Sequence, residues 1–367
     1  MKSVIILLLI GIAIVFAFKI PPKSPVLQDD IKKKAGGPDI EKDIEVVVRD
    51  LEIPWEVAFL PNNEFLITER PGRLVRIGRD RRVIEVEGVH HIGEGGLMGM
   101  TLHPKFAENS FIYLYFTTRQ EDRITNRVER YKFQNDALTG RRLIIGGILG
   151  SSVHDGGRIE FGPDGYLYIT TGDAGNSDLA QNKNSPNGKI LRVKDDGSIP
   201  ADNPFGSAVY SYGHRNAQGL TWDKDKRLWA TEHGRSGIQS GLDELNLIES
   251  GKNYGWPQIQ GDQERVGMIR PVINSGPSET WAPAGATYAS GRIFFAGLRG
   301  ETLYEAQIDG VKLKTLKKHL VGKYGRLRAV RLGPDGYLYI TTSNRDGRGN
   351  PRPDDDKLIR INPRAFQ

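Results

Sequence analysis

Residues 152–173 combine one histidine with a glycine-rich turn, in the sequence SVHDGGRIEFGPDGYLYITTGD. The histidine, His154, is followed closely by two glycines that let the backbone turn and leave the imidazole uncrowded. Imidazole titrates near neutral pH, so His154 can act as a general base toward a hydroxyl group. A turn histidine that hydrogen-bonds to the backbone has the same local sequence, and the motif alone leaves both interpretations open.

Two further loops carry groups suited to binding or electrostatic stabilisation. The segment YGHRNAQGL holds Arg215 and Asn216. A guanidinium can contact a carboxylate or a developing oxyanion, and an amide can donate and accept. A hydrogen-bonded connecting loop is the alternative. The glycine-rich segment TEHGRSG, residues 231–237, can turn backbone carbonyls inward as Ca²⁺ ligands, whereas His233 is interpreted as structural.

Arginines recur toward the C-terminus. Arg326 and Arg328 stand two residues apart, on one face of a predicted strand, and Arg299 lies in an earlier segment. Converging guanidiniums repel one another unless an anion lies among them, while exposure to solvent is the alternative for any single arginine. Glu94, in GEGGLMG, is a further candidate for the same site. Its loop is not a phosphate loop, because Gly-Lys-Ser/Thr is absent and no helix is predicted after it.

An internal repeat predicts the fold that positions these residues. The scheme is a hydrophobic pair, a turn of the Pro-Asp-Gly type, an aromatic-rich strand and a polar loop, recurring about every 50 to 60 residues. Its six instances are residues 57–77, 100–118, 158–171, 220–234, 286–303 and 328–344. They predict an all-β, six-bladed β-propeller with four antiparallel strands per blade. Residues just before and after the repeated strand then converge at one end of the central channel.

A pair of β-sandwiches is the alternative fold, but it would not require the near-identical copies PDGYLYITT. The composition agrees with an all-β chain, since 44 glycines and 20 prolines in 367 residues favour tight turns. The net charge of +6 is spread along the chain, so no nucleic-acid partner is implied. With no cysteine, disulfides, thiolate metal sites and a cysteine nucleophile are excluded. The lack of cysteine and the arginine-containing charge clusters are compatible with heat stability.

The N-terminus has the layout of a targeting segment. Lys2 precedes an apolar run over residues 4–18, and a proline- and lysine-rich stretch follows. We therefore expect a signal peptide or N-terminal membrane anchor plus linker over residues 1–37. The expected consequence is export, with retention at a membrane as a possibility of the anchor. The propeller is predicted over residues 43–367.

The motifs together resemble those of one family. They are GEGGLMG, HDGGRIEFGPDGYLYITTGD, YGHRNAQGL, TEHG with DELN, GKNYGWP, WAPAG and GRLRAVRLGPDGYLY. This set resembles the soluble pyrroloquinoline-quinone (PQQ) sugar dehydrogenases of the glucose/sorbosone dehydrogenase family, and within it the aldose sugar dehydrogenases. The resemblance implies a six-bladed propeller that holds PQQ and Ca²⁺ in a basic cleft. It also implies oxidation of aldose sugars at C1 to the lactone, with electrons passed to an external acceptor.

The resemblance assigns roles to the catalytic and metal-binding candidates. His154 would take the proton of the C1 hydroxyl while hydride passes to PQQ. Arg215 would polarise the quinone oxygen that gathers negative charge, with Asn216 beside it. Gly234 and Arg235 would offer backbone carbonyls to Ca²⁺, a Lewis acid toward the quinone.

Further residues match the family's cofactor and substrate contacts. Arg326 and Arg328 would hold PQQ carboxylates or flank its ring, and Arg299 and Thr280 match two more PQQ contacts. The three carboxylates of PQQ would explain why arginines converge. Glu94 falls where the family's glucose enzyme has a substrate-contacting glutamine. The segment GKNYGWP, residues 251–257, can serve packing alone.

Departures from the glucose enzyme favour broad aldose specificity and a monomer. Val153 replaces an acidic residue, Glu94 replaces glutamine, and Arg235 stands at a proline position. Two rival functions stay open. A Ca²⁺-dependent propeller lactonase or esterase would ring a central ion with acidic and asparagine side chains. A non-catalytic binding propeller would be expected to lose the histidine or arginine of these loops.

Overall fold

The structure, a computed structural model, describes residues 43–237 and 240–366. The chain divides into two units, and all described residues belong to the second, Ile40–Gln367. The predicted targeting segment and linker lie outside the described residues, so that interpretation stays a prediction. Among the described residues, no helix has the length and apolar character needed to cross a membrane.

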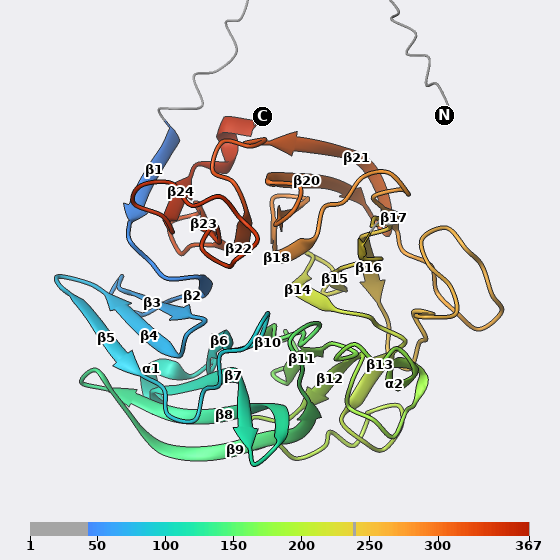
Figure 1. The fold of residues 1–367 in the computed structure, drawn as a ribbon, viewed down its shortest axis with the longest axis horizontal. Coiled ribbons are helices and arrows are strands. Elements are labelled where there is room, and N and C mark those ends of the chain that lie inside the picture. Colours follow the sequence, from blue (N-terminus) through green and yellow to red (C-terminus); the bar gives the residue numbers. More distant parts are fainter. Residues whose placement is uncertain (1–42, 238–239, 367) are drawn as a thin grey trace, which may run out of the picture. The chain divides into compact units, whose positions relative to one another are not determined.

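Six four-stranded antiparallel sheets surround a common centre and confirm the predicted six-bladed β-propeller (Figure 1). Blade 1 consists of β2 (Pro54–Phe59), β3 (Phe65–Glu69), β4 (Arg73–Ile77) and β5 (Arg81–Glu85). Blade 2 consists of β6 (Leu97–Leu102), β7 (Phe111–Gln120), β8 (Arg123–Gln134) and β9 (Ala137–Leu149). Blade 3 consists of β10 (Ile159–Phe161), β11 (Leu167–Thr171), β12 (Lys189–Val193) and β13 (Val209–Tyr212).

The second half of the ring follows the same plan. Blade 4 consists of β14 (Ala217–Trp222), β15 (Leu228–Glu232), β16 (Glu244–Ile248) and β17 (Ile273–Asn274). Blade 5 consists of β18 (Pro283–Ala289), β19 (Arg292–Gly297), β20 (Thr302–Asp309) and β21 (Lys312–His319). Blade 6 consists of β22 (Leu327–Leu332), β23 (Leu338–Thr342), β24 (Leu358–Ile361) and β1 (Ile44–Val48). The described helices are short: α1 (Phe106–Asn109), α2 (Asp178–Gln181) and the 3₁₀ helix η4 (Pro363–Phe366).

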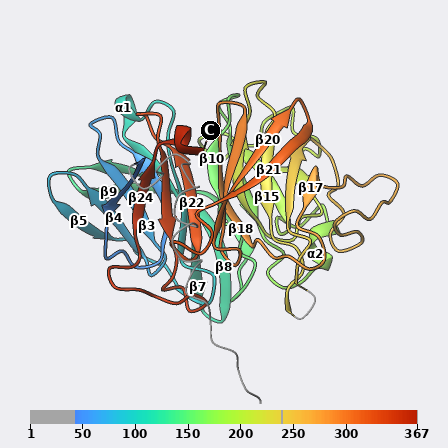
Figure 2. The same cartoon turned by 90° about the horizontal axis from the view of Figure 1, so that it is seen from above.

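Blade 6 closes the ring by combining both ends of the described chain. Its outer strand β1 pairs antiparallel with β24, with Ile44 opposite Ile361. The inner strand β22 contacts β2, which joins the last blade to the first (Figure 1). On its other side β22 contacts β18 of blade 5 (Figure 2). The repeat predicted six blades but did not predict that the fourth strand of blade 6 comes from the N-terminal end.

The two Pro-Asp-Gly copies form the same local network. In blade 3, the Asp164 carboxylate accepts hydrogen bonds from the Tyr168 hydroxyl at 2.9 Å and from Arg192 Nε at 3.0 Å. In blade 6, Asp335 accepts from Tyr339 at 3.0 Å and from Arg360 at 2.8 Å. The glycine of each turn has a positive φ, 80° and 79°, which L-residues rarely adopt. The repeated sequence therefore forms the same turn between the first two strands of two different blades.

A buried charge network joins three blades near the axis. Glu56 of β2 is fully buried and binds both Arg158, beside β10, and Arg331 of β22, the latter at 2.7 Å. Arg331 also pairs with Glu160 of β10. Burial by itself would raise the pKa of Glu56, but the two guanidiniums outweigh it and lower that pKa. The network therefore keeps buried charges of both signs compensated.

We expect Glu56→Gln to lower the free energy of unfolding by roughly 3–5 kcal/mol, because it leaves buried guanidiniums without their counter-charge. Chemical denaturation at pH 7 measures this. The folded-state pKa of Glu56 is lowered, so its contribution is present above the unfolded pKa of about 4.3 and is lost as the pH falls. Asp80→Asn is the matched control, since the Arg76–Asp80 pair is half exposed on the aspartate side and should matter little. Equal effects of the two substitutions would contradict the assignment.

Candidate functional site

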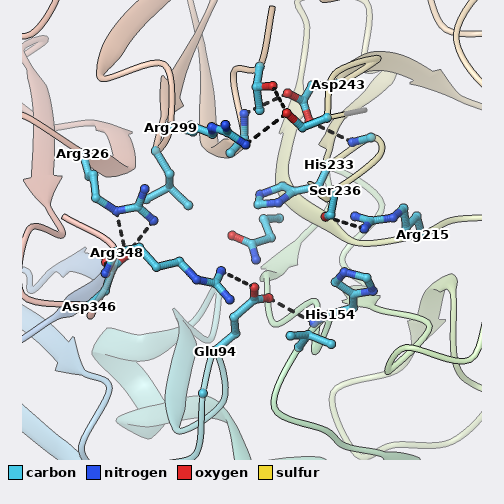
Figure 3. A pocket seen from close by; sticks show the side chains of 18 of the residues that line it. Glu94, His154, Arg215, His233, Ser236, Asp243, Arg299, Arg326, Asp346 and Arg348 are labelled. Atoms are coloured by element: carbon cyan, nitrogen blue, oxygen red, sulfur yellow. Dashed lines mark hydrogen bonds and ion pairs between the residues drawn. The ribbon is translucent and has the colours of Figure 1, made fainter. Parts of the chain in front are cut away.

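A cavity of about 630 Å³ is lined by residues from all six blades (Figure 3). Most of these residues immediately precede the first strand of a blade or follow its second strand. Those before a first strand are Glu94, His154, Arg215, Thr280 and Arg326. Those after a second strand include Arg70, Gly234, Arg299 and Asp346. The convergence that the repeat predicted is therefore observed, because a propeller brings equivalent blade ends around one axis.

His154 is held in a strained turn at the edge of this cavity. Its φ of 57° places it in the left-handed region, which non-glycine residues rarely adopt. The backbone carbonyl oxygen of His154 lies very close to Gly172. A Cβ atom on residue 172 would lie only 1.7 Å from that oxygen. The end of β11 can therefore approach the histidine only because residue 172 is glycine.

An aspartate determines which imidazole nitrogen carries the proton. Asp173 Oδ1 lies 2.7 Å from His154 Nδ1. Burial would raise the pKa of Asp173, but the hydrogen bonds from His154, Gly175 and Trp256 hold it below its usual value. An ionised carboxylate only accepts hydrogen bonds, so Nδ1 is the donor, and in the neutral form of the ring Nε2 carries the lone pair. This arrangement suits a general base.

Asp173 is a site residue that the sequence motifs did not predict. Val153 replaces the expected acidic neighbour of His154, and the carboxylate comes instead from the far end of the β10–β11 hairpin. The signal was present, because antiparallel pairing of β10 with β11 brings the residues before one strand beside those after the other. The equivalent residue in blade 6, Asn344, also contacts the preceding loop, accepting the N–H of Arg326 at 2.9 Å.

Glu94 lines the cavity, with both carboxylate oxygens bonded to protein groups. Oε1 lies 2.5 Å from Arg348 Nη1, and Oε2 accepts the backbone N–H of His154 at 3.0 Å. Burial opposes ionisation, but the Arg348 guanidinium and the backbone N–H of His154 help to lower the pKa of Glu94 to about 2. Glu94 therefore braces the histidine turn. Its predicted contact with substrate stays a prediction.

Arg215 enters the cavity from the loop before β14. One of its nitrogens, Nη2, donates to Ser236 Oγ at 2.7 Å, while its buried Nε has no partner in the described part of the chain. Its backbone N–H binds Glu232, which also holds His214 at 2.8 Å. Asn216 lies behind the cavity lining rather than in it. Its Oδ1 accepts the N–H of Gly156 at 3.0 Å.

The paired arginines of blade 6 are both buried, contrary to the alternative of solvent exposure. Arg326 makes two bonds to Asp346 Oδ2, at 2.9 and 2.8 Å, whereas Arg328 lies 3.5 Å from the same oxygen. Burial and the nearby Arg70 lower the pKa of Arg328 to about 9. One carboxylate is shared between two guanidiniums, so Arg328 is under-compensated.

Blade 5 contributes a smaller polar group. Ser240 Oγ accepts from Arg299 Nη1 and from Thr280 Oγ1, each at 3.0 Å. The structure thus brings the predicted Arg299 and Thr280 together through a serine that the sequence analysis did not single out.

The predicted Ca²⁺ loop also reaches the cavity, where Gly234 and Arg235 are lining residues. The Gly234 N–H donates to Asp243 Oδ1 at 2.8 Å, which fixes the turn. Within residues 43–237 and 240–366, no cluster of three or more acidic or histidine side chains has the arrangement of a metal site. A site made of backbone carbonyls is a different kind of site, so the Ca²⁺ ligands stay a prediction.

The described lining has a strong excess of positive charge. Its arginines are Arg70, Arg215, Arg235, Arg299, Arg326, Arg328 and Arg348. Its carboxylates are Glu94, Asp243 and Asp346. Burial lowers the pKa of His233 to about 3, so that ring adds no charge at neutral pH. Arg215 and Arg235 each have a buried Nε–H without a partner among the described residues, and these donors point to an anionic ligand with several acceptor groups. The sequence analysis had not selected Arg70, Arg348, Asp243 or Asp346.

Fold and cavity together define a six-bladed propeller in which a histidine–aspartate pair faces an arginine-rich anion site. Residues 51–360 match the model of the glucose/sorbosone dehydrogenase family, and the chain belongs to that family. It is 30% identical over 357 residues to aldose sugar dehydrogenase YliI of Escherichia coli, covering 88% of this chain and 93% of that protein. It is 32% identical over 263 residues to quinoprotein glucose dehydrogenase B of Acinetobacter calcoaceticus, covering 61% and 54%.

A solved structure gives a similar result. The PQQ-bound aldose sugar dehydrogenase of Streptomyces coelicolor superposes with a TM-score of 0.80 at 39% identity, covering 87% of this chain and 97% of that one.

The excess positive charge of the cavity lining can be tested by measuring how tightly the cavity binds an anion. We expect Arg328→Gln to weaken citrate binding to the cofactor-free protein by about tenfold, and Glu94→Gln to tighten it. Isothermal titration calorimetry at low salt measures both. Arg119→Gln is the control, because Arg119 is exposed and lies outside the cavity lining. Citrate affinity that is the same in Arg328→Gln as in the native protein would contradict an anion site.

Proposed function

We propose that this protein is a PQQ-dependent dehydrogenase that oxidises aldose sugars at C1 to the lactone and passes the electrons to an external acceptor. The observation that carries the proposal is the pairing of a histidine–aspartate dyad with an arginine-rich cavity. Family membership and the PQQ-bound relative from Streptomyces support it. Broad aldose specificity, a monomeric state and export are parts of the same proposal.

The residues present fit a tricarboxylate cofactor. Arg326 and Arg328 supply buried cations with only one shared counter-ion, and Arg328 is the less compensated of the two. Arg299 and Thr280 offer donors from blade 5. We further propose that the carbonyls of Gly234 and Arg235 hold Ca²⁺, for which hard oxygen ligands are suited. When bound, PQQ supplies a hydride acceptor, and Ca²⁺ increases its electrophilicity.

His154 and Asp173 handle the proton. Nε2 of His154 accepts the proton of the C1 hydroxyl as hydride leaves C1, and the C–O bond becomes the carbonyl of the lactone. Asp173 keeps the proton on Nδ1 and stabilises the imidazolium that forms. The carboxylate itself stays ionised, consistent with its lowered pKa.

Arg215 and Asn216 complete the polar environment. Arg215 directs a guanidinium into the cavity and has an unused buried N–H, so it is suited to bind an oxygen that gains negative charge. Asn216 holds Gly156 and thereby the turn that carries His154. A Ca²⁺-dependent lactonase is less well supported. Such a site would ring a central ion with acidic and asparagine side chains from several blades, and it would leave the arginine cluster of the lining without a role.

Reconstitution tests the function directly. Protein freed of cofactor is mixed with PQQ and Ca²⁺, and dye reduction is followed with glucose, galactose and xylose. We expect turnover with several aldoses and its loss on chelation of Ca²⁺. Absence of both a spectral response to PQQ and dye reduction would sink the proposal.

The role of the base is tested by His154→Ala. We expect turnover to fall by roughly 10²- to 10⁴-fold, with PQQ affinity within about twofold of the native value. His319→Ala is the control, since His319 also contacts a carboxylate, Glu305, at 2.8 Å but lies outside the cavity lining. Turnover at the native level in His154→Ala would exclude His154 as the base.

A further inference from the structure

Trp256 contacts two residues of the candidate site, Asp173 and Arg215. The indole Nε1–H of Trp256 donates to Asp173 Oδ2 at 2.9 Å. The other oxygen of that carboxylate holds His154 Nδ1 at 2.7 Å. The guanidinium of Arg215 lies 5.3 Å from the centre of a Trp256 ring. The segment GKNYGWP, for which the sequence allowed a role in packing alone, therefore contacts both the aspartate that holds His154 and the Arg215 guanidinium.

Trp256 is itself fixed by bonds outside the cavity. Its backbone N–H donates to the Gly213 carbonyl at 2.9 Å, and its carbonyl accepts from Gln181 Nε2 at 2.6 Å. Gln181 is in turn paired with Asn253, in both directions, at 2.8 and 3.1 Å. The indole is thus positioned by blades 3 and 4 before any ligand binds.

The indole N–H matters because Asp173 is buried. With the donor present, each carboxylate oxygen has a partner, since Oδ1 binds His154 and the Gly175 N–H, and Oδ2 binds Trp256. Without it, Oδ2 would be left unsatisfied in a residue that is only 1% exposed. Rotation of the carboxylate would then relieve this cost and weaken the bond to His154 Nδ1.

We propose that Trp256 is a positioning residue that sets the tautomer of His154 through Asp173 and the direction of the Arg215 guanidinium through its ring. The single rigid side chain of Trp256 then aligns both His154, as the base, and the Arg215 guanidinium toward the same substrate. The inference rests on the proposed function for its kinetic consequence. Its structural consequence, the tautomer of His154, holds for the cofactor-free protein.

Trp256→Phe tests the hydrogen bond while keeping an aromatic ring. We expect kcat to fall roughly ten- to hundredfold, the loss typical of a hydrogen bond to a charged group, with KM for the aldose and PQQ affinity within about twofold. In the cofactor-free protein, ¹⁵N NMR should show His154 shifting from the Nδ1–H toward the Nε2–H tautomer. Trp256→Ala should in addition weaken PQQ binding, because Arg215 loses the ring beside it.

Trp229→Phe is the matched control. Trp229 Nε1 also donates to a carboxylate, Asp223 Oδ2, at the same 2.9 Å, but lies outside the cavity lining. It should alter stability without altering the His154 tautomer or kcat. If Trp256→Phe does not fold, benzothienylalanine at position 256, in which sulfur replaces the N–H, removes the same bond with the shape retained.

The outcomes separate the two hypotheses. An unchanged His154 tautomer together with native kcat, when the Trp256 N–H is removed, overturns the positioning role. Native protein that neither binds PQQ nor oxidises aldoses overturns the proposed function, whereas a shifted tautomer in that case still supports the role of Trp256.

Discussion

Repulsion among buried guanidiniums is the constraint around which this propeller is arranged. Seven arginines line one cavity, and three carboxylates of the described lining offset them only in part. The buried members of this cluster are Arg70, Arg215, Arg326 and Arg328. Such a cluster is costly in a low-dielectric site, and a closed ring of blades must hold it in place. The strand pair β1–β24 closes that ring, and the buried network around Glu56 joins blades 1, 3 and 6 near the axis. Stability of the scaffold therefore holds together an arginine cluster whose own charges repel one another.

The catalytic candidates depend on a second constraint, which is the satisfaction of buried polar groups. His154 has a left-handed backbone conformation. Glu94 accepts the backbone N–H of His154, and Asp173 binds the imidazole at Nδ1. Asp173 is buried and needs a donor on each oxygen, and Trp256 supplies one of them. Each partner comes from a different part of the chain. The base is consequently fixed by a hydrogen-bonded chain that spans several loops, in which its own motif supplies only Asp173.

Much of the fold was predictable because a propeller repeats one local plan. The Pro-Asp-Gly turn, the aromatic strand and the spacing recur in the sequence, and Asp164 and Asp335 make the same contacts in their two blades. The repeat also predicted that residues at equivalent blade ends converge, which placed His154, Arg215 and Arg326 in one cavity. The closing strand β1 was not predicted, since a single isolated strand carries no repeat signal. Strand β1 occupies its place because β24, near the other end of the chain, would otherwise have an unpaired edge.

The sequence by itself determined the fold class, the family resemblance and the residue types at the cavity, because these follow from local pattern and motif order. Tertiary structure decided which charges meet. Asp346 binds both Arg326 and Arg328, Arg348 of blade 6 pairs with Glu94 of blade 2, and Trp256 of blade 4 contacts Asp173 of blade 3. The distances behind these contacts depend on how blades close around an axis, and residues far apart in the chain become neighbours only there. For the same reason the motif of His154 contains Asp173 at its far end, but only the pairing of β10 with β11 in the folded protein brings the two side chains together.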